Sequence, residues 1–352
     1  MLATRRGGGR KSLAVRVGIN GFGRIGRNFF RAARDNTSFE IVAANDIGSA
    51  EQLAHLLRYD SILGRYPGQI SHGKTSIQVD GKEVEILSTG SPGDIDWAGL
   101  GVDLVVESTG VFTEADRARL HIDKGGAKKV IITAPAQGED ITICMGVNDK
   151  AYQPAEHHVI SNASCTTNCL APVAKVLHQD FGIESGLMTT CHAYTGDQRL
   201  LDAIHKDRRR ARAAALSMIP TSTGAAQAVA RVLPELKGRF QGFSLRVPVP
   251  DVSIVDFSVV TERPTSVEAV NDALRTAAAG DLRGILRVEE DELVSIDFQG
   301  DPHSSIVDAR LTAMAGSRHL KVLAWYDNEW GYSCRVAELV ALVADGLFTS
   351  SN

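Results

Sequence analysis

The sequence predicts an α/β protein with two domains, a doubly wound parallel sheet followed by an α+β domain whose sheet is mostly antiparallel. Length is the first reason, because 352 residues exceed one ordinary domain of roughly 100 to 200 residues. Up to residue 164, apolar β-branched runs alternate with helical patterns, as they do in parallel sheets. Between residues 165 and 330, strand-like runs follow one another with few helices between them.

The first domain, residues 13–164, opens on a β-α-β unit. In this unit, "SLAVRVGIN" predicts a strand, "RIGRNFFRAARD" a helix and "FEIVAAND" a second strand. A hairpin is expected to turn at Asp80 and Gly81, a pair that favours positive φ angles. Further helices are expected in "SAEQLAHLLRYD" and "EADRARLHIDKGG", and further strands in "VDLVVEST", "KKVIITAP" and "HHVISNA".

The second domain, residues 165–330, is expected to build a sheet that is covered on one side. Within "SIVDFSVVTE", Val255, Phe257 and Val259 share one face, and Asp256 and Ser258 share the other. The remaining strands are expected in "GLMTTCHAY", "GFSLRVPVP", "LVSIDFQG", "SSIVDARLTAMA" and "HLKVLAWYD". The last segment, residues 331–348, has apolar residues at helical spacing, and we expect this helix to pack back on the first domain.

Composition argues against several classes of protein. The apolar fraction of 43% and the charged fraction of 23% are those of soluble globular proteins. No apolar run approaches the roughly 18 residues that a bilayer span needs, so membrane function is not expected. The net charge of −4 gives no general reason to bind nucleic acid, although the run "HKDRRRARA" (residues 205–213) is basic.

The number of cysteines and the N-terminal segment bear on the cellular compartment of the protein. Five cysteines are an odd number in a long chain and do not suggest a disulfide framework, which favours a reducing, cytoplasmic location. Residues 1–12, "MLATRRGGGRKS", carry four basic side chains and lack the apolar core of a secretory signal. We expect a disordered extension there, and a shortened organellar presequence is the weaker alternative.

A glycine-rich turn follows the first strand and opens the first helix. Gly21, Gly23 and Gly26 have the G-x-G-x-x-G spacing that lets a backbone approach a pyrophosphate at a helix N-terminus. Asp46 ends the second strand, twenty residues beyond Gly26, where a carboxylate accepts hydrogen bonds from ribose hydroxyls and repels a 2′-phosphate. The pattern is typical of a Rossmann-type domain that binds NAD, and it disfavours NADP.

The segment "SNASCTTNCLAP" places Cys165 where the last strand of the first domain should end. A helix that begins there would direct its N-terminus at the sulfur and lower the pKa of the thiol. Pro172 is awkward in the interior of such a helix and is expected to kink it. A buried structural thiol remains an alternative, whereas the spacing of Cys165 and Cys169 lacks the second pair of a zinc site. No metal site is expected.

A thiolate nucleophile needs a base. His192, in "CHAYTGDQ", comes at the end of the first strand of the second domain and is the best placed of the ten histidines. Paired with Cys165, this imidazole would activate the thiol, and it would later exchange protons with the reacting oxygen.

With these three motifs together, the sequence closely resembles the phosphorylating glyceraldehyde-3-phosphate dehydrogenase family from Leu13 to Phe348. The resemblance implies that D-glyceraldehyde 3-phosphate is oxidised with NAD and inorganic phosphate to 1,3-bisphosphoglycerate. Cys165 would form a thiohemiacetal and then a thioester, with His192 moving the protons. The resemblance also implies a homotetramer, in which the basic run serves subunit contacts and attracts phosphate, so that nucleic acid is no longer an expected partner.

The resemblance assigns binding residues in two groups. The cofactor would be bound by Gly21, Gly23, Arg24, Ile25, Gly26, Asp46, Thr109, Gly110, Thr133 and Asn328, the last orienting the nicotinamide carboxamide. The attacking phosphate would be bound by Ser164, Thr166, Thr223, Gly224 and Arg246, and the substrate phosphate by Thr195 and Arg246. Tyr332 is expected near the nicotinamide ring, and Cys169 is expected to be a packing thiol.

Three positions depart from relatives that use both cofactors. Ile47 and Ile204 stand where those forms carry small hydroxyl residues, and Gly90 stands where an arginine often lies. Each change removes a partner of a 2′-phosphate, so NAD is expected to be preferred at least about tenfold. The alternatives left open are a form of the enzyme that uses NADP or both cofactors, erythrose-4-phosphate dehydrogenase, and a binding protein that keeps the fold without catalysis.

Overall fold

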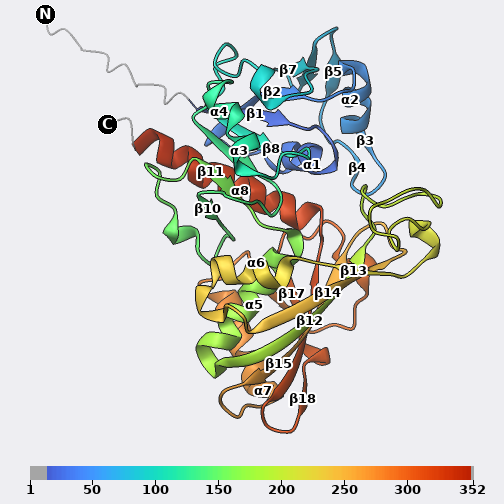
Figure 1. Ribbon diagram of the computed structural model, residues 1–352, viewed down its shortest axis with the longest axis vertical. Helices are drawn as coiled ribbons and strands as arrows, with labels where there is room; N and C mark the ends of the chain where they lie inside the picture. Colours follow the sequence, from blue (N-terminus) through green and yellow to red (C-terminus); the bar gives the residue numbers. More distant parts are fainter. Residues whose placement is uncertain (1–13, 350–352) are drawn as a thin grey trace, which may run out of the picture.

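The computed structural model describes residues 14–349, and the expected extension at residues 1–12 lies outside them. Two halves lie one above the other along the long axis, each built on its own sheet (Figure 1). The described residues form the α-helices α1 (Arg24–Ala32), α2 (Ala50–Arg58), α3 (Ala115–Ala118), α4 (Leu120–Asp123), α5 (Cys165–Phe181), α6 (Ala225–Val232), α7 (Val267–Ala279) and α8 (Trp330–Thr349).

The strands divide between the two halves. The first half contains β1 (Val15–Asn20), β2 (Phe39–Asn45), β3 (Tyr59–Asp60), β4 (Gly64–Arg65), β5 (Ile70–His72), β6 (Ser76–Val79), β7 (Lys82–Leu87), β8 (Leu104–Glu107), β9 (Lys129–Ile132), β10 (Ile141–Thr142) and β11 (Val159–Ser161). The second half contains β12 (Ile183–Ala193), β13 (Ile219–Ser222), β14 (Phe240–Val247), β15 (Ser253–Thr261), β16 (Leu286–Glu289), β17 (Ser305–Asp308), β18 (Ala313–Ala315) and β19 (His319–Tyr326).

The first sheet confirms the predicted doubly wound arrangement. Its order is β10-β11-β9-β8-β1-β2-β7-β6-β5, parallel from β10 to β7 and antiparallel only at the β7, β6 and β5 edge. The β6–β7 hairpin turns at Asp80 and Gly81, whose φ angles of 50° and 81° suit a two-residue turn of the expected kind. Parallel strands direct their carboxyl ends to one edge, which becomes the edge that faces ligands.

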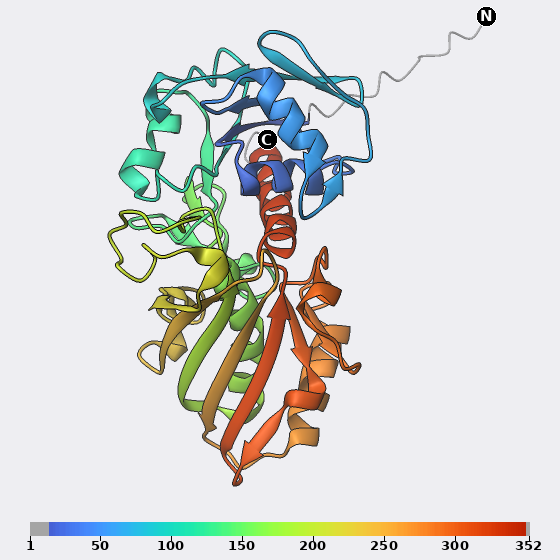
Figure 2. The ribbon, with the colours of Figure 1, turned by 90° about the vertical axis from the view of Figure 1, so that its right-hand side faces the viewer.

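The second sheet is mixed and mostly antiparallel, as predicted. Its order is β13-β14-β12-β15-β19-β17-β16, with β18 added to β19, and only the β12–β14 and β16–β17 pairs are parallel. Val255, Phe257 and Val259 of β15 are buried beneath α5, α6 and α7, which lie on one face of the sheet (Figure 2). None of the α-helices within residues 14–349 covers the opposite face.

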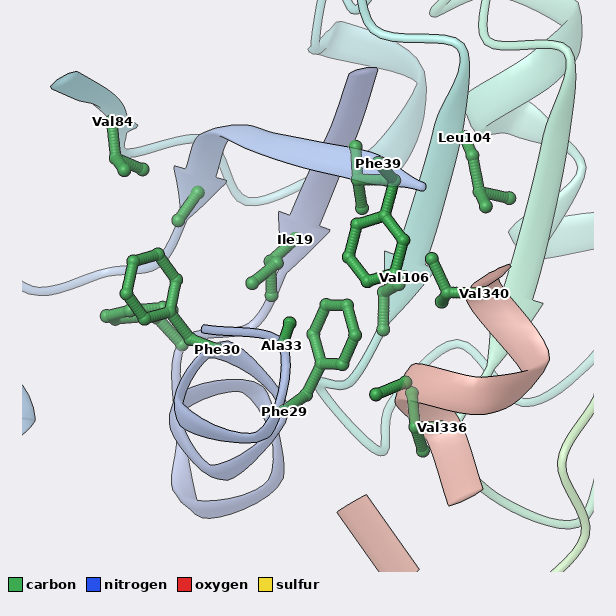
Figure 3. Close-up of a cluster of buried hydrophobic side chains, with 14 of the residues drawn as sticks. Ile19, Phe29, Phe30, Ala33, Phe39, Val84, Leu104, Val106, Val336 and Val340 are labelled. Carbon is green, nitrogen blue, oxygen red and sulfur yellow. The ribbon is translucent and has the colours of Figure 1, made fainter. Parts of the chain in front are cut away.

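Helix α8 connects the second half to the core of the first. It packs along α1, and Val336 and Val340 enter the cluster formed by Phe29, Phe39 and neighbouring side chains (Figure 3). The rings of Phe29 and Phe39 stack with centroids 6.0 Å apart. The burial of aromatic and branched side chains from both helices and from β2 therefore fixes the position of α8 relative to α1.

Two local expectations require correction. The segment "LVSIDFQG" forms a 3-10 turn at residues 295–298 and no strand, because Phe298 stacks on Trp325 and Asp297 accepts a hydrogen bond from Val294 N. The helix expected in residues 114–126 divides into α3 and α4. Helix α5 runs through Pro172 to Phe181, so the proline does not end it, and the helix packs against α6, α7 and the sheet.

Candidate active site

Cys165 is the first residue of α5, directly after the last parallel strand of the first half. Ser164 caps the helix, and its Oγ accepts a hydrogen bond from Thr167 N at 3.0 Å. Ala163 precedes the cap with a φ of 55°, a left-handed conformation that is uncommon for a residue with a side chain. This turn of the chain places the sulfur at the helix N-terminus, where free N–H groups favour an anion.

His192 meets Cys165 from the other half of the chain. The Cys165 Sγ lies 3.4 Å from His192 Nε2, and His192 is only 4% exposed at the end of β12. Its Nδ1 lies 2.7 Å from the carbonyl oxygen of Ala193. Two groups contact this nitrogen: the Ala193 carbonyl can only accept, and Arg246 Nη1, 3.0 Å away, can only donate. The carbonyl contact is the shorter of the two, so we place the hydrogen on Nδ1, which leaves Nε2 free to take the proton of the thiol.

Burial changes the ionisation of both groups. Burial raises the pKa of Cys165, and the nearby positive charge of Arg246 and the N–H groups at the start of α5 oppose this rise. Burial, followed by repulsion from Arg246, lowers the pKa of His192 to about 3. The N–H groups at the start of the helix lower the pKa of the thiol as expected, but desolvation is larger, so the net change is upward. Transfer of a proton from Sγ to Nε2 creates both charges together, so each compensates the other.

Arg246 supplies the positive charge of the site. Its Nη1 lies 3.1 Å from the Thr195 Oγ1 and 3.0 Å from the His192 Nδ1. Asp197 accepts hydrogen bonds from Thr195 Oγ1 and, at 2.5 Å, from Arg210 Nη1. Burial alone would raise the pKa of Asp197, but the Thr195 hydroxyl and the two guanidinium groups lower it overall. Arg210 is paired with both Asp197 and Asp207, whereas Arg246 forms no ion pair within the described residues, so the charge of Arg246 suits an anionic ligand.

A second feature is a pocket of about 330 Å³ at the carboxyl edge of the parallel sheet, lined by Asn20, Gly21, Gly23, Asn45, Asp46, Ile47, Thr89, Gly90, Ser91, Ser108, Thr109, Val111 and Phe112. Helix α1 begins there with Gly23 at the N-cap position and without a capping side chain. Its first N–H groups are therefore free for an anion such as a pyrophosphate.

The three glycines of the turn show that this pocket fits a dinucleotide. A Cβ at Gly21, whose φ is 92°, would lie 2.6 Å from Thr109 N, and a Cβ at Gly26 would lie 2.1 Å from the Gly21 oxygen. A Cβ at Gly23 would meet nothing within 4 Å. Gly21 and Gly26 therefore serve the close packing of the chain, whereas Gly23 leaves open space where a pyrophosphate would lie.

Models of two protein domains match the chain. The model described as "Glyceraldehyde 3-phosphate dehydrogenase, NAD binding domain" matches residues 15–115, and the model of the C-terminal domain of the same enzyme matches residues 164–328. The chain belongs to the glyceraldehyde-3-phosphate dehydrogenase family. This finding confirms the resemblance on which the sequence-based assignment of residues rests.

Curated relatives cover nearly the whole chain. Glyceraldehyde-3-phosphate dehydrogenase of Streptomyces coelicolor is 57% identical over 337 residues, which are 95% of this chain and 100% of the relative. The enzyme of the same name from Geobacillus stearothermophilus is 57% identical over 332 residues, 94% of this chain and 99% of the relative. Glyceraldehyde-3-phosphate dehydrogenase 2 of Trichormus variabilis is 56% identical over 334 residues, with 94% and 99% covered.

The structure places the remaining cofactor residues of the family pattern around the same edge. Gly21, Gly23, Asp46 and Thr109 line the pocket together. Gly110 follows Thr109, Ile25 and Gly26 lie in the first turn of α1, and Thr133 follows β9 with its N–H bonded to Glu107 O. Asp46 Oδ2 accepts a hydrogen bond from Phe22 N at 2.7 Å, which fixes the carboxylate beside the glycine turn.

Arg24, one of the residues predicted to bind the cofactor, uses its side chain for ion pairs within the chain. Its Nε donates to Glu329 at 3.0 Å, and its Nη1 donates to Asp60 at 2.6 Å. Burial would lower the pKa of Arg24, but these two carboxylates raise it overall. The guanidinium thus connects α1 to the residue before α8, and the backbone N–H of Arg24 lies in the first turn of α1, beside the glycine turn.

The expected phosphate residues come together only in part. Thr195 and Arg246 are in contact, and Ser164 and Thr166 flank Cys165. The two hydroxyls beside Cys165 have partners within the chain: that of Ser164 caps α5, and that of Thr166 bonds Tyr326. Thr223 and Gly224 lie beyond the end of β13, and the register of β13 with β14 pairs Arg246 with Ile219 at the opposite end. Within the described residues, no hydrogen bond joins Thr223 or Gly224 to Arg246.

Two residues of the wider site were not assigned a role by the sequence analysis. The Tyr326 hydroxyl lies 2.9 Å from Thr166 Oγ1 and 2.8 Å from Thr190 Oγ1, and its ring meets the ring of His192 edge-on at 5.9 Å. Arg210 belongs to the basic run, yet it turns inward to Asp197 and to Thr221 Oγ1 at 3.0 Å. No local pattern marks either residue, since both reach the site through distant parts of the chain.

No helix in the part of the chain that the structure describes is long and apolar enough to cross a membrane.

Proposed function

We propose that this protein oxidises D-glyceraldehyde 3-phosphate with NAD and inorganic phosphate to 1,3-bisphosphoglycerate. The observation that carries the proposal is the 3.4 Å contact of Cys165 Sγ with His192 Nε2 at the N-terminus of α5, beside Arg246. Relatives that match along nearly the whole chain bear the name glyceraldehyde-3-phosphate dehydrogenase. NAD accepts the hydride when it is bound.

Acylation begins at the sulfur. As Sγ attacks the aldehyde carbon, the thiol proton moves to His192 Nε2, and the aldehyde oxygen is protonated to give a thiohemiacetal. When the hydride leaves that carbon, Nε2 takes the hydroxyl proton and a thioester remains on Cys165. The backbone N–H of Cys165, which has no helical partner at this first position, stabilises the charge that develops on the substrate oxygen.

Phosphate binding follows from the cations of the site. Arg246 directs Nη1 at Thr195, and its Nη2 makes no hydrogen bond within the described residues, so this nitrogen is available to the substrate phosphate. Thr223 and Gly224 precede α6, a helix whose N-terminus carries no side-chain cap, and we assign the attacking phosphate to it together with Ser164 and Thr166. Attack of that phosphate on the thioester releases the acyl phosphate and returns the proton to the thiolate.

Preference for NAD over NADP rests on the wall of the cofactor pocket. Asp46, Ile47 and Gly90 all line it. The region of the adenosine ribose therefore faces one carboxylate, one apolar side chain and one glycine, which has no side chain. Ile47 is 90% exposed and offers no hydrogen bond to a 2′-phosphate. We expect NAD to be used at least about tenfold more efficiently, since a lost charge-assisted hydrogen bond amounts to roughly 1.5 kcal/mol.

A homotetramer fits the uncovered face of the second sheet. Leu187 and Phe243 project from β12 and β14 on the side without helices and are 66% and 50% exposed. Leu200, Leu201 and Ile204 are exposed on the loop after β12. Exposed apolar side chains on this face and on the loop favour association of copies. The five cysteines are all unpaired, which supports a reducing compartment such as the cytoplasm.

Steady-state kinetics test the function and the cofactor at once. Turnover of D-glyceraldehyde 3-phosphate is expected to need inorganic phosphate, and kcat/KM with NAD is expected to exceed that with NADP at least about tenfold. Turnover that is independent of phosphate but fast with erythrose 4-phosphate would instead support erythrose-4-phosphate dehydrogenase. Equal efficiency with both cofactors would contradict the assignment of Asp46, Ile47 and Gly90.

A further inference from the structure

Ser253 begins β15 and lies between two residues of the proposed site. It is 1% exposed. Its Oγ accepts a hydrogen bond from Ala193 N at 3.0 Å and donates one to Asn328 Oδ1 at 2.6 Å. A hydroxyl has one hydrogen to donate, so both directions are fixed by these partners. One oxygen atom thus connects the end of β12 with the loop between β19 and α8.

The contact with Ala193 occurs where a strand pair ends. The register of β12 with β15 ends at Cys191 and Ile254, so the ladder offers no backbone carbonyl to the Ala193 N–H. The Ser253 hydroxyl takes that N–H instead. The carbonyl of the same Ala193 accepts from His192 Nδ1 at 2.7 Å and thereby sets the tautomer of the base. Ser253 therefore holds the residue that holds the imidazole.

The contact with Asn328 determines which amide atom remains available. Ser253 occupies Oδ1, and no hydrogen bond within the described residues engages Nδ2. The backbone around Asn328 is fixed as well, because Asp327 Oδ1 accepts hydrogen bonds from Glu329 N and Trp330 N. Asn328 consequently presents N–H donors, which match the carbonyl oxygen of a carboxamide.

The backbone before Ser253 is in a strained conformation. Val252 has a φ of 65°, which is unusual for a β-branched residue, and it is buried against Phe298 and Ile306. Such a conformation persists only where the surroundings determine it strongly. Here the turn at Val252 directs the first side chain of β15 toward Ala193 and Asn328.

We propose that Ser253 is a positioning residue for both proton transfer and cofactor orientation. Through Ala193 it keeps His192 in the tautomer that faces Cys165, and through Asn328 it keeps one face of the nicotinamide ring toward the thiohemiacetal carbon. Because one hydroxyl contacts both Ala193 and Asn328, it fixes the position of the His192 imidazole relative to the Asn328 amide. The proposal rests on the function proposed above and deepens it.

The test is Ser253→Ala, compared with Ser305→Ala as a matched control. Ser305 is also a fully buried serine on a strand of the same sheet, with its hydroxyl near Cys169 Sγ. For Ser253→Ala we expect NAD binding about tenfold weaker by titration calorimetry, since one oriented hydrogen bond is lost. With aldehyde substrate deuterated at the transferred position, we expect deuterium on one face of NADH for the wild type and on both faces for this variant.

Additional variants separate positioning from folding. Ser253→Cys keeps the shape of the side chain, but a thiol forms only weak hydrogen bonds. This variant should therefore fold and should also place deuterium on both faces of NADH. In an Asn328→Ala background, Ser253→Ala should add little further loss of NAD binding, because the second contact is already gone. Wild-type affinity and single-face transfer in both Ser253 variants would overturn the inference and leave the proposed function intact. Failure of the proposed function would instead appear as absence of turnover in the wild type.

Discussion

The two ligand-binding edges of this molecule are built in different ways. The cofactor edge uses backbone: three glycines, the uncapped start of α1 and a single carboxylate, Asp46. The catalytic edge uses side chains that reach one another from distant segments, namely Cys165 on α5, His192 on β12 and Arg246 on β14. A site made of backbone groups can be predicted from a short sequence pattern, whereas a site made of side chains from distant segments depends on the whole fold.

Burial also acts differently at the two edges. At the cofactor edge the glycine positions decide whether space is filled or left open. At the catalytic edge burial decides ionisation, raising the pKa of the thiol and lowering that of the imidazole. A substitution at the first edge is therefore expected to change binding or packing, and one at the second edge is expected to change chemistry.

The largest expected effect comes from Cys165→Ser. An alcohol is a far weaker nucleophile than a thiolate, so kcat for NADH formation should fall at least about 10³-fold while NAD binding is retained. Cys169→Ala is the control, because Cys169 is a buried thiol one helical turn away. The Cys169→Ala enzyme should keep most of the wild-type activity. Stopped-flow absorbance and calorimetry measure the two quantities. A serine variant that still forms an acyl-enzyme at the wild-type rate would refute the assignment of Cys165 as the nucleophile.

Removal of the base should have the next largest effect. His192→Asn is expected to slow acylation by a factor on the order of 10² to 10⁴, the usual contribution of general acid-base catalysis. The burst of NADH in a single turnover measures this step directly. Full activity in the variant would show that the 3.4 Å contact with Cys165 has no catalytic role.

The glycine turn allows a comparison within the cofactor edge. Gly23→Ala should fold normally, because its Cβ meets no atom of the chain, but should bind NAD at least about tenfold more weakly by filling the space for the pyrophosphate. Gly26→Ala should lower the melting temperature, since its Cβ would lie 2.1 Å from the Gly21 oxygen. Thermal unfolding and calorimetry of both variants test this. The reverse pattern would mean that the two glycines have been assigned wrongly.

The smallest effect concerns Asp251, close to Asp327 at the junction of the halves. Burial, together with the charges of Asp327 and Glu329, raises the pKa of Asp251 to about 8, and neither of its carboxylate oxygens has a hydrogen-bond partner in the described structure. Between its ordinary pKa of 3.8 and 8, the folded state holds a proton that the unfolded chain releases, so stability falls as the pH rises through this window.

Asp251→Asn should therefore raise the melting temperature by about 2 °C or more at pH 9, where the whole loss of stability has accumulated, and by less at pH 5, where only a small part of the window has been crossed. Scanning calorimetry at the two pH values measures the difference. An equal shift at both would show that the carboxyl does not titrate as described.

The sequence predicts the cofactor edge well because its signals are local. The spacing of Gly21, Gly23 and Gly26 and the position of Asp46 determine the turn, the helix start and the carboxylate without reference to distant residues. Both sheets also follow from the order and alternation of apolar runs. The 3-10 turn at residues 295–298 was missed because the stacking of Phe298 on Trp325 overrides an apolar pattern that resembles a strand.

The catalytic edge is predicted only in part. Cys165 and His192 stand out through their motifs, but Ser253 and Tyr326 become visible only when β15 and β19 lie beside β12. The roles of Arg24 and Arg210 could not be foreseen, since their carboxylate partners come from remote segments or from a loop without regular structure. The direction of the pKa change at Cys165 depends on how densely protein surrounds the sulfur, which no sequence pattern reports.

The central claim is that Cys165 ionises by giving its proton to His192. The rate of alkylation of Cys165 by iodoacetamide, measured against pH in the wild type and in His192→Asn, tests it most directly. Loss of the imidazole leaves burial to keep the thiol protonated, so the profile of the variant should move to higher pH. Profiles that coincide would contradict proton transfer within the pair.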